Sequence, residues 1–390
     1  MKTLLIKGAR IIDGTGEPPV VPGAVLVRGD KIEAVGTAAL NLVGEAVETL
    51  DCGSETLLPG LIDCHNHLSL DPTLDNYLNR MTDPLPELTI RAVRTMEIDL
   101  QAGVTTSRYL GDKGFLDIHC RQAQADGRLA GPRIITATRG LRATHGHGFV
   151  GYPFSGAENI RRAVRENLAA GADLIKIYLT GTLRSSRGLP QSYSREEVQL
   201  LVDEAHRAGV PVATHCIGGP ALHTAVETGI DVIEHGYFIT DEEIELLLRS
   251  SCWLVMTPSI FFTDERIRPL PPNLVEGHLQ QREEVGRRLT AAIEAGVRYA
   301  AGTDGFHGGL GRELQYLTDF GASPMEALMA ATSRAAEVCG LADTIGSINV
   351  GRLADIIGVE GDPMQDIQAL QRVRTVVQSG QVVKSSTVEI

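Results

Sequence analysis

Short apolar segments with the character of β-strands lie at both ends of the chain. They are residues 24–27 and 32–35 on either side of Arg28-Gly29-Asp30-Lys31, and residues 373–377 and 381–383 on either side of Ser379-Gly380. A polar turn that contains glycine between two apolar runs is a strong signal for a β-hairpin. We therefore expect residues 1–55 and 346–390 to pack together as one small β-sandwich domain.

Between these ends, strand-like runs alternate with amphipathic helical stretches. Eight short apolar runs lie near residues 57–64, 104–109, 133–138, 173–176, 210–215, 231–235, 253–257 and 299–304. Helical periodicity separates them, for example at residues 158–170, 195–208 and 240–249. Eight such units over residues 56–345 predict a (β/α)8 TIM barrel, a fold whose active sites lie at the carboxyl ends of the strands.

The segment from residue 262 to residue 285 interrupts this alternation. It is rich in proline and charge, and it includes Arg268-Pro269-Leu270-Pro271-Pro272. Loops of this length inside a compact domain usually have a function. We expect a long loop over the mouth of the barrel, and whether it moves as a lid is left open.

Composition narrows the class of protein. With 390 residues and 43% hydrophobic content, the chain can bury one large core. The formal net charge of -13 argues against nucleic acid or an anionic membrane as a partner, but it says little about the substrate. We expect a small-molecule substrate because of the candidate chemistry described below. No apolar run approaches the ~20 residues of a membrane span. The six cysteines are widely spaced, without a Cys-x-x-Cys pair, which favours reduced thiols and a cytoplasmic protein. We also expect a homo-oligomer.

Residues of the types that bind metal ions lie at the ends of five of these strands. The candidates are His65, His67, Lys176, His215, His235 and Asp304. His65 and His67 are two positions apart, so in a strand both imidazoles point to the same face. Zinc accepts imidazole and carboxylate ligands. A shared metal site is favoured over isolated polar residues, because unpaired charges in a barrel core would be costly.

The motifs around these residues resemble the amidohydrolase superfamily, and the resemblance covers the whole chain. The motifs are Pro59-Gly-Leu-Ile-Asp-Cys-His-Asn-His67, Ile175-Lys-Ile177, Thr214-His215, Ile233-Glu-His-Gly236, Gly302-Thr-Asp304, Glu326-Ala-Leu-Met-Ala-Ala-Thr332 and residues 345–355. Within the superfamily, the chain is most similar to the imidazolonepropionase-like and prolidase-like branch. That branch includes dipeptidases and carboxypeptidases that release Pro, Lys or Arg, and enzymes that hydrolyse N-acyl amino acids.

The resemblance implies two divalent metal ions, with zinc as the default and Mn, Co or Fe also compatible. His65, His67 and Asp304 would hold the first ion, and His215 and His235 the second. Lys176 would bridge them as a carbamate formed with carbon dioxide, since a lysine ammonium would repel two cations. A bridging hydroxide would attack the substrate carbonyl, with Asp304 as general base and then acid.

Further residues on the expected active-site face are candidates for substrate binding. The segment Thr144-His-Gly-His-Gly148 resembles a Gly-His element of the same branch, which implies that His147 contacts the substrate and belongs with Asp304 to the catalytic site. Arg139, Arg142, Arg184, Arg187 and His307 follow strands on the same face. Because arginine suits carboxylate recognition, we expect one of these arginines to help His147 hold a substrate carboxylate.

The sequence thus predicts a binuclear metal-dependent hydrolase that cleaves an amide C–N bond, in a dipeptide or an N-acyl amino acid. Hydrolysis of a cyclic amide, or of a small urea or carbamate, is the second reading. A mononuclear deaminase is the third, although one ion needs no bridging Lys176. A non-catalytic scaffold belongs to a different class, but such a protein would be expected to lose ligands. Released amino acid, released ammonia or no turnover would separate these functions.

Overall fold

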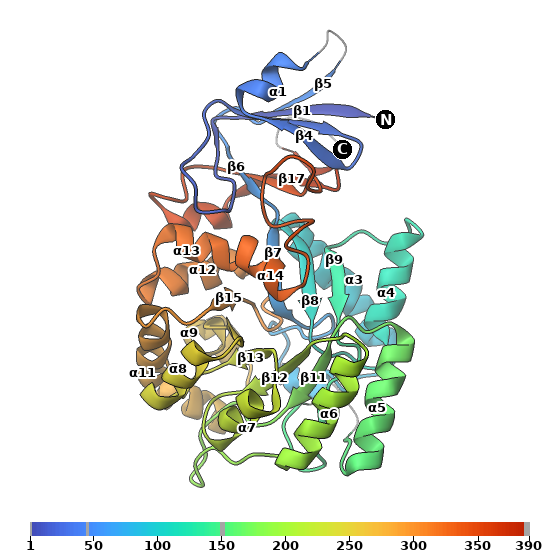
Figure 1. Ribbon diagram of the computed structural model, residues 1–390, viewed down its shortest axis with the longest axis vertical. Helices are drawn as coiled ribbons and strands as arrows, with labels where there is room; N and C mark the ends of the chain where they lie inside the picture. The colour runs from blue at the N-terminus through green and yellow to red at the C-terminus, as the bar shows by residue number, and fades with distance from the viewer. Residues whose placement is uncertain (1, 44–46, 149–152, 386–390) are drawn as a thin grey trace. The chain divides into compact units, whose positions relative to one another are not determined.

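The computed structural model describes residues 2–43, 47–148 and 153–385. The chain divides into two compact units. In Figure 1 the colour follows the residue number, from blue at the N-terminus to red at the C-terminus. Unit 1 comprises Met1–Asp63, Glu97–Thr106 and Gly308–Ile390, and unit 2 comprises Cys64–Met96 and Ser107–His307. The domain limits expected from the sequence stay a prediction.

Unit 1 contains a β-sandwich made from both ends of the chain. One sheet has the order β4-β3-β1-β5 and the other has the order β18-β17-β16-β6-β2. The strands are β1 (Thr3–Gly8), β2 (Arg10–Ile11), β3 (Gly23–Arg28), β4 (Lys31–Val35), β5 (Glu48–Asp51), β6 (Thr56–Pro59), β16 (Ile356–Val359), β17 (Val373–Gln378) and β18 (Gln381–Lys384). Buried side chains from both sheets, among them Ile6, Val25, Leu57, Ile356 and Val377, form one hydrophobic cluster. The two sheets therefore share a core, as the sequence predicted.

Both expected hairpins are present. In the first, β3 and β4 are antiparallel and Arg28 pairs with Lys31 across the turn. In the second, Gln378 pairs with Gln381. The intervening Ser379 and Gly380 both have positive φ, which suits a tight hairpin turn.

The strands of the predicted barrel are also present. They are β7 (Leu61–Asn66), β8 (Val104–Tyr109), β9 (Arg133–Thr136), β11 (Ile175–Tyr178), β12 (Val212–Cys216), β13 (Val232–His235), β14 (Trp253–Met256) and β15 (Tyr299–Ala301). The hydrogen-bonded orders are β7-β8-β9 and, with the short β10 (Leu141–Arg142), β10-β11-β12-β13-β14-β15. Main-chain hydrogen bonds link the two arcs, from Asp173 N to Thr136 O and from Thr303 N to His65 O. These links close the (β/α)8 barrel.

Helices alternate with the barrel strands (Figure 1). They are α2 (Tyr77–Arg80), α3 (Leu85–Gln101), α4 (Leu116–Ala125), α5 (Ala157–Ala170), α6 (Arg195–Arg207), α7 (Pro220–Thr228), α8 (Asp241–Arg249), α9 (Ser259–Phe262), α10 (Asp264–Ile267) and α11 (Pro272–Glu294). Four further helices belong to unit 1: α1 (Thr37–Asn41), α12 (Leu310–Asp319), α13 (Pro324–Ala330) and α14 (Ser333–Val338). The sequence predicted α5, α6 and α8 to within one residue at each end. Two of these have clear start signals, because Ser194 with Glu197 and Thr240 with Glu243 form capping boxes.

The expectation of a long loop over residues 262–285 was wrong. Two short helices, α9 and α10, occupy its start, and α11 covers everything from Pro272 onward. Proline at the first helical position is favourable, because it has no N–H group to leave unsatisfied there. Prolines at 269, 271 and 272 therefore precede and start a helix and do not mark a loop.

Two other expectations concern the surroundings of the protein. Among the described helices, none combines the length and the apolar character that a membrane span requires. All six cysteines are free thiols, and five of them are buried.

Candidate metal centre

The barrel brings the six candidate ligands to one region of unit 2. His65 lies in β7 and His67 follows that strand, while His215 is next to last in β12 and His235 ends β13. Asp304 lies beyond β15. Lys176 is the second residue of β11, so its main chain lies deeper in the barrel than a strand end, and its side chain interacts electrostatically with Glu234 and Asp304.

A carboxylate lies between the first two histidines. The Oδ1 atom of Asp304 is 3.5 Å from Nε2 of His65 and 3.3 Å from Nε2 of His67. Because His65 and His67 are two positions apart in the sequence, both imidazoles point toward the same carboxylate. This arrangement of two nitrogens and one oxygen is a common part of zinc sites.

The other two histidines adjoin this group. The ring centroids of His215 and His235 are 4.3 Å apart, and those of His65 and His235 are 4.6 Å apart. One potential ligand atom from each of His65, His235 and Asp304 lies within 4.8 Å of the others. His235 thus connects the two parts of the candidate centre.

Each of the four histidines is anchored through one ring nitrogen, which leaves the other nitrogen for a metal ion. His65 Nδ1 donates to Glu234 at 2.8 Å, and His67 Nδ1 donates to the main-chain oxygen of Gly111 at 2.7 Å. His215 Nε2 donates to the main-chain oxygen of Gly181 at 3.2 Å, and His235 Nδ1 is hydrogen-bonded to Thr257 Oγ1 at 2.8 Å. Histidines that bind metals almost always have such an outer partner, because it fixes the tautomer and the ring orientation.

The anchor of His65 is a buried ion pair that the sequence reading missed. Glu234 is fully buried, and its second oxygen accepts a hydrogen bond from Arg108 at 2.9 Å. Burial alone would raise the pKa of Glu234, but Arg108 and His65 lower it to about 2, so the carboxylate stays charged. A signal was available, because Glu234 is a charged residue within an apolar strand and needs a partner.

We expect Glu234→Gln to weaken zinc binding by ~10–100-fold, the usual effect of changing an outer partner of a metal ligand. Glutamine keeps the size of the side chain but loses the charge that orients His65. Competition with a chelating dye would measure the zinc affinity. Glu245→Gln, at an exposed ion pair with Arg249, is a matched control. Equal affinities for the Glu234 variant and the wild type would show that this anchor is dispensable.

Two buried polar atoms of the centre have no hydrogen-bond partner. They are Nζ of Lys176 and Nε2 of His235. Buried polar atoms without partners are rare in folded proteins, and a missing ion is one explanation for them. Burial also lowers the pKa of Lys176 to about 8, which favours the neutral amine that reacts with carbon dioxide. The residues present therefore fit a metal centre with a carboxylated lysine.

The backbone at two of the ligands adopts an unusual conformation. His235 has a φ of 81° and Asp304 has a φ of 50°, in the left-handed region that non-glycine residues seldom occupy. Such residues cost ~1–3 kcal/mol each and cluster at functional sites. Next to Asp304, a Cβ atom at Gly302 would lie 2.4 Å from Cβ of His65, so only glycine permits this approach of β15 to β7.

Arg266 of α10 supports Asp304. This arginine is 2% exposed, and its guanidinium donates to the main-chain oxygens of Thr303 and Asp304. Burial would raise the pKa of the Asp304 carboxyl, but the adjacent His65, hydrogen bonds from His65 and His67, and Arg266 bring it well below its usual value. Asp304 is therefore ionised and can both ligate a cation and accept a proton.

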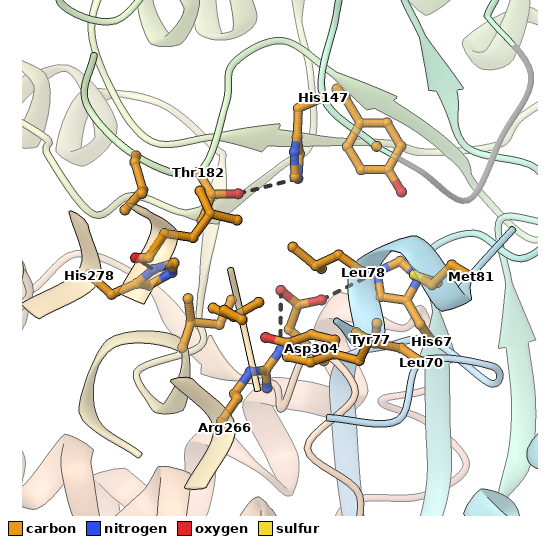
Figure 2. Close-up of a pocket in the computed structure, with 16 residues that line it drawn as sticks. His67, Leu70, Tyr77, Leu78, Met81, His147, Thr182, Arg266, His278 and Asp304 are labelled. Carbon is orange, nitrogen blue, oxygen red and sulfur yellow. Dashed lines mark hydrogen bonds and ion pairs between the residues drawn. The ribbon is translucent and has the colours of Figure 1, made fainter. Parts of the chain in front are cut away.

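A cavity of about 270 Å³ opens beside these residues in unit 2. Figure 2 shows His147 and Thr182 on one side of the cavity, with Leu78 and the carboxylate of Asp304 across from them. Oγ1 of Thr182 and Nε2 of His147 are 3.3 Å apart. Burial, with added repulsion from Lys176, His67 and Arg142, lowers the pKa of His147 to about 4. The imidazole is thus neutral at pH 7 and presents one N–H donor.

The remaining candidates for substrate binding lie outside the lining of this cavity. Arg139 pairs with Glu166, and Arg184 pairs with Glu284. Arg187 is exposed, and Nε2 of His307 is 2.9 Å from the main-chain oxygen of Leu70. Arg142 is half-buried, and its charge acts on the pKa of His147. Of the four arginines, Arg142 is therefore the one with a link to the cavity.

The sequence reading missed the residues of the cavity wall. Tyr77, Tyr178, Arg266, Leu274 and His278 all line the cavity. Three of them belong to the segment that was interpreted as a loop, and Tyr178 lies two residues after Lys176 on the same face of β11. That alternation rule could have identified Tyr178.

Comparison with known proteins gives a consistent picture. The model of the amidohydrolase family matches residues 56–383. Ochratoxinase from Aspergillus niger is 30% identical over 96% of this chain and 85% of its own length. Imidazolonepropionase from Fusobacterium nucleatum is 26% identical over 86% of this chain and 84% of its own length. The structure of a Xaa-Pro dipeptidase with methionine bound in its active site has a TM-score of 0.87 and 28% identity, and the match covers 98% of this chain and 100% of that one.

Proposed function

This chain belongs to the amidohydrolase family, and we propose that it is a binuclear metal-dependent hydrolase that cleaves the amide C–N bond of a dipeptide or an N-acyl amino acid. The single observation that carries the proposal is the set of four anchored histidines. The free nitrogens of His65 and His67 lie 3.5 and 3.3 Å from Asp304, His235 shares a ligand-sized space with His65 and Asp304, and the ring of His215 adjoins that of His235. The amine of Lys176 is buried and has no hydrogen-bond partner.

In this proposal, His65, His67 and Asp304 would hold one ion, and His215 and His235 would hold the other. Lys176 would contribute as its carbamate, because a negative charge would replace the positive charge that repels the ions. When bound, such ions polarise a carbonyl and lower the pKa of water to ~7. The anchors of the histidines keep the ligand nitrogens in place while substrate binds.

Asp304 moves the proton. Its carboxylate is ionised, lines the cavity and is held by Arg266 through the main chain. It accepts a proton from the water that attacks the carbonyl carbon, and it then delivers this proton to the nitrogen that leaves.

The size of the cavity and one of the relatives support an amino acid derivative as the substrate. A space of about 270 Å³ suits a small molecule and is too small for a long peptide. The related Xaa-Pro dipeptidase binds methionine in its active site. His147 supplies a neutral N–H donor at the edge of the cavity, near the charge of Arg142.

We expect the enzyme to recognise the free carboxylate of the substrate through His147 with help from Arg142. A hydrogen bond to a charged group is worth roughly 1.5–3 kcal/mol, which corresponds to ~10–150-fold in kcat/KM. The comparison to make is an N-acyl amino acid against its own methyl ester. Equal kcat/KM values for the acid and the ester would show that the enzyme does not recognise the substrate carboxylate.

A screen of N-acyl amino acids and dipeptides with the zinc-loaded protein tests the proposed function. Release of the amino acid, and its loss after removal of the metal, is the expected result. Release of ammonia in its place would indicate a deaminase. No turnover with zinc, manganese, cobalt or iron would exclude the proposal.

A further inference from the structure

Six apolar side chains form a hydrophobic wall of the cavity. It is formed by residues that follow β7 and by the segment from α9 to α11: Leu70, Leu78, Met81, Ile260, Leu270 and Leu274. Leu70, Met81 and Leu270 are buried and belong to one hydrophobic cluster, against which Leu78 and Leu274 pack. Figure 2 shows Leu70, Leu78 and Met81 across the cavity from His147.

We propose that this wall selects substrates whose acyl group is large, apolar and uncharged, of the size of an arylalkanoyl group. The inference rests on the proposed function, because His147 is taken to hold the carboxylate of the amino acid that leaves. With the amino acid at His147 and the scissile bond at Asp304, the acyl group lies against the opposite wall.

The volume of the cavity agrees with a group of this size. A dry cavity of about 150 Å³ in another protein is known to accommodate benzene. The space beside Asp304 is about 270 Å³, which leaves room for an aromatic ring together with part of an amino acid. An acetyl group would leave most of the hydrophobic wall uncovered.

The charges around the wall disfavour an ionised acyl group. Among the described residues that line the cavity, the side chains of lysine, arginine, aspartate and glutamate are represented by Arg266 and Asp304. Arg266 donates to the main-chain oxygens of Thr303 and Asp304, and its guanidinium lies 3.8 Å from Oδ2 of Asp304. A second carboxylate on the acyl group would therefore lose its hydration against leucine and methionine side chains without gaining a dedicated partner.

A series of substrates that differ in the acyl group alone tests the proposal. The series is N-acetyl, N-hexanoyl, N-(3-phenylpropanoyl) and N-succinyl derivatives of the amino acid that the screen releases fastest, or of L-alanine if none is released. We expect kcat/KM to rise ~10–100-fold from acetyl to 3-phenylpropanoyl, the effect of burying one large apolar side chain. The succinyl derivative is expected to fall below the hexanoyl derivative.

Variants locate the effect on the wall. Leu274→Ser is expected to lower the ratio of kcat/KM for the 3-phenylpropanoyl and acetyl substrates by ~3–10-fold, because part of the apolar contact is lost. Leu279→Ser is the control, since Leu279 lies on the same helix and is 50% exposed. The control is expected to keep the wild-type ratio, and thermal unfolding would show that both variants fold.

Calorimetric binding of the same derivatives separates this proposal from the proposed function. Tighter binding of the 3-phenylpropanoyl derivative than of the acetyl derivative, without hydrolysis of either, would support the wall and exclude the hydrolase. Hydrolysis of both at equal kcat/KM, or a preference that follows the leaving amino acid alone, would overturn the proposed role of the wall and leave the hydrolase standing. A faster reaction with the succinyl derivative would also overturn it.

Discussion

Replacing Asp304 by asparagine is expected to lower kcat by at least ~10²–10⁴-fold while the fold persists. Asparagine has nearly the same shape, so it preserves the packing between β15 and β7. It cannot accept a proton from the attacking water, however, and it weakens the negative charge that lies 3.3–3.5 Å from the imidazoles of His65 and His67. The hydrogen bonds from Arg266 go to main-chain oxygens and survive the change.

The measurement is kcat under saturating zinc, with elemental analysis of the same sample and thermal unfolding as a check of the fold. Asp241→Asn is a matched control, because Asp241 lies at the start of α8 and is 90% exposed in an ion pair with Arg288. A near-normal kcat in a metal-replete Asp304→Asn protein would show that Asp304 does not transfer the proton.

The second large effect is expected at Lys176. Methionine at this position keeps an unbranched, buried side chain but cannot form a carbamate. The Lys176→Met protein should therefore bind fewer than two ions and lose more activity than the ~10–100-fold expected from changing an outer partner of a ligand. Wild-type protein given ¹³C-labelled bicarbonate should show a carbamate carbon signal in its NMR spectrum, and the variant should lack it.

Lys113→Met serves as the control for the loss of a lysine, because Lys113 hydrogen-bonds to main-chain oxygens of Thr82 and Asp83 away from the centre. It should keep both the metal content and the labelled signal. If Lys176→Met protein held two ions and turned over at the wild-type rate, Lys176 would not be a bridging group.

The candidate ligands could be predicted from the sequence because the barrel fixes where strand ends go. Residues as far apart as His65 and Asp304 must meet once each ends a strand of the same closed sheet. The alternation of side chains then decides that His65 and His67 point the same way. The periodicity of α5, α6 and α8 is equally local, so their limits could also be predicted.

The anchors could not be predicted, because they depend on the register between strands. Gly111 and Gly181 supply main-chain oxygens, which any residue possesses and no sequence pattern marks. Thr257, which directly follows the neighbouring strand β14, is hydrogen-bonded to His235. Glu234 could have been noticed as a buried charge, but its partners His65 and Arg108 come from two other strands.

The cavity wall was missed for a different reason. Prolines around residue 270 were interpreted as the mark of an irregular loop. Helices α10 and α11 were therefore not predicted, although both lie near the site. Arg266 and Leu274 therefore had no predicted position. The helical spacing of Leu274 and His278, with Pro272 at the start of the helix, was the signal that could have placed them.

The central claim is that two metal ions held by these residues drive amide hydrolysis. It is tested most directly by adding zinc in fractions of an equivalent to metal-free protein, with bicarbonate present, and measuring the rate at which amino acid is released. The rate is expected to rise until two equivalents per chain have been added and then to stay constant. A full rate in the metal-free protein, or a plateau after one equivalent, would contradict a binuclear centre.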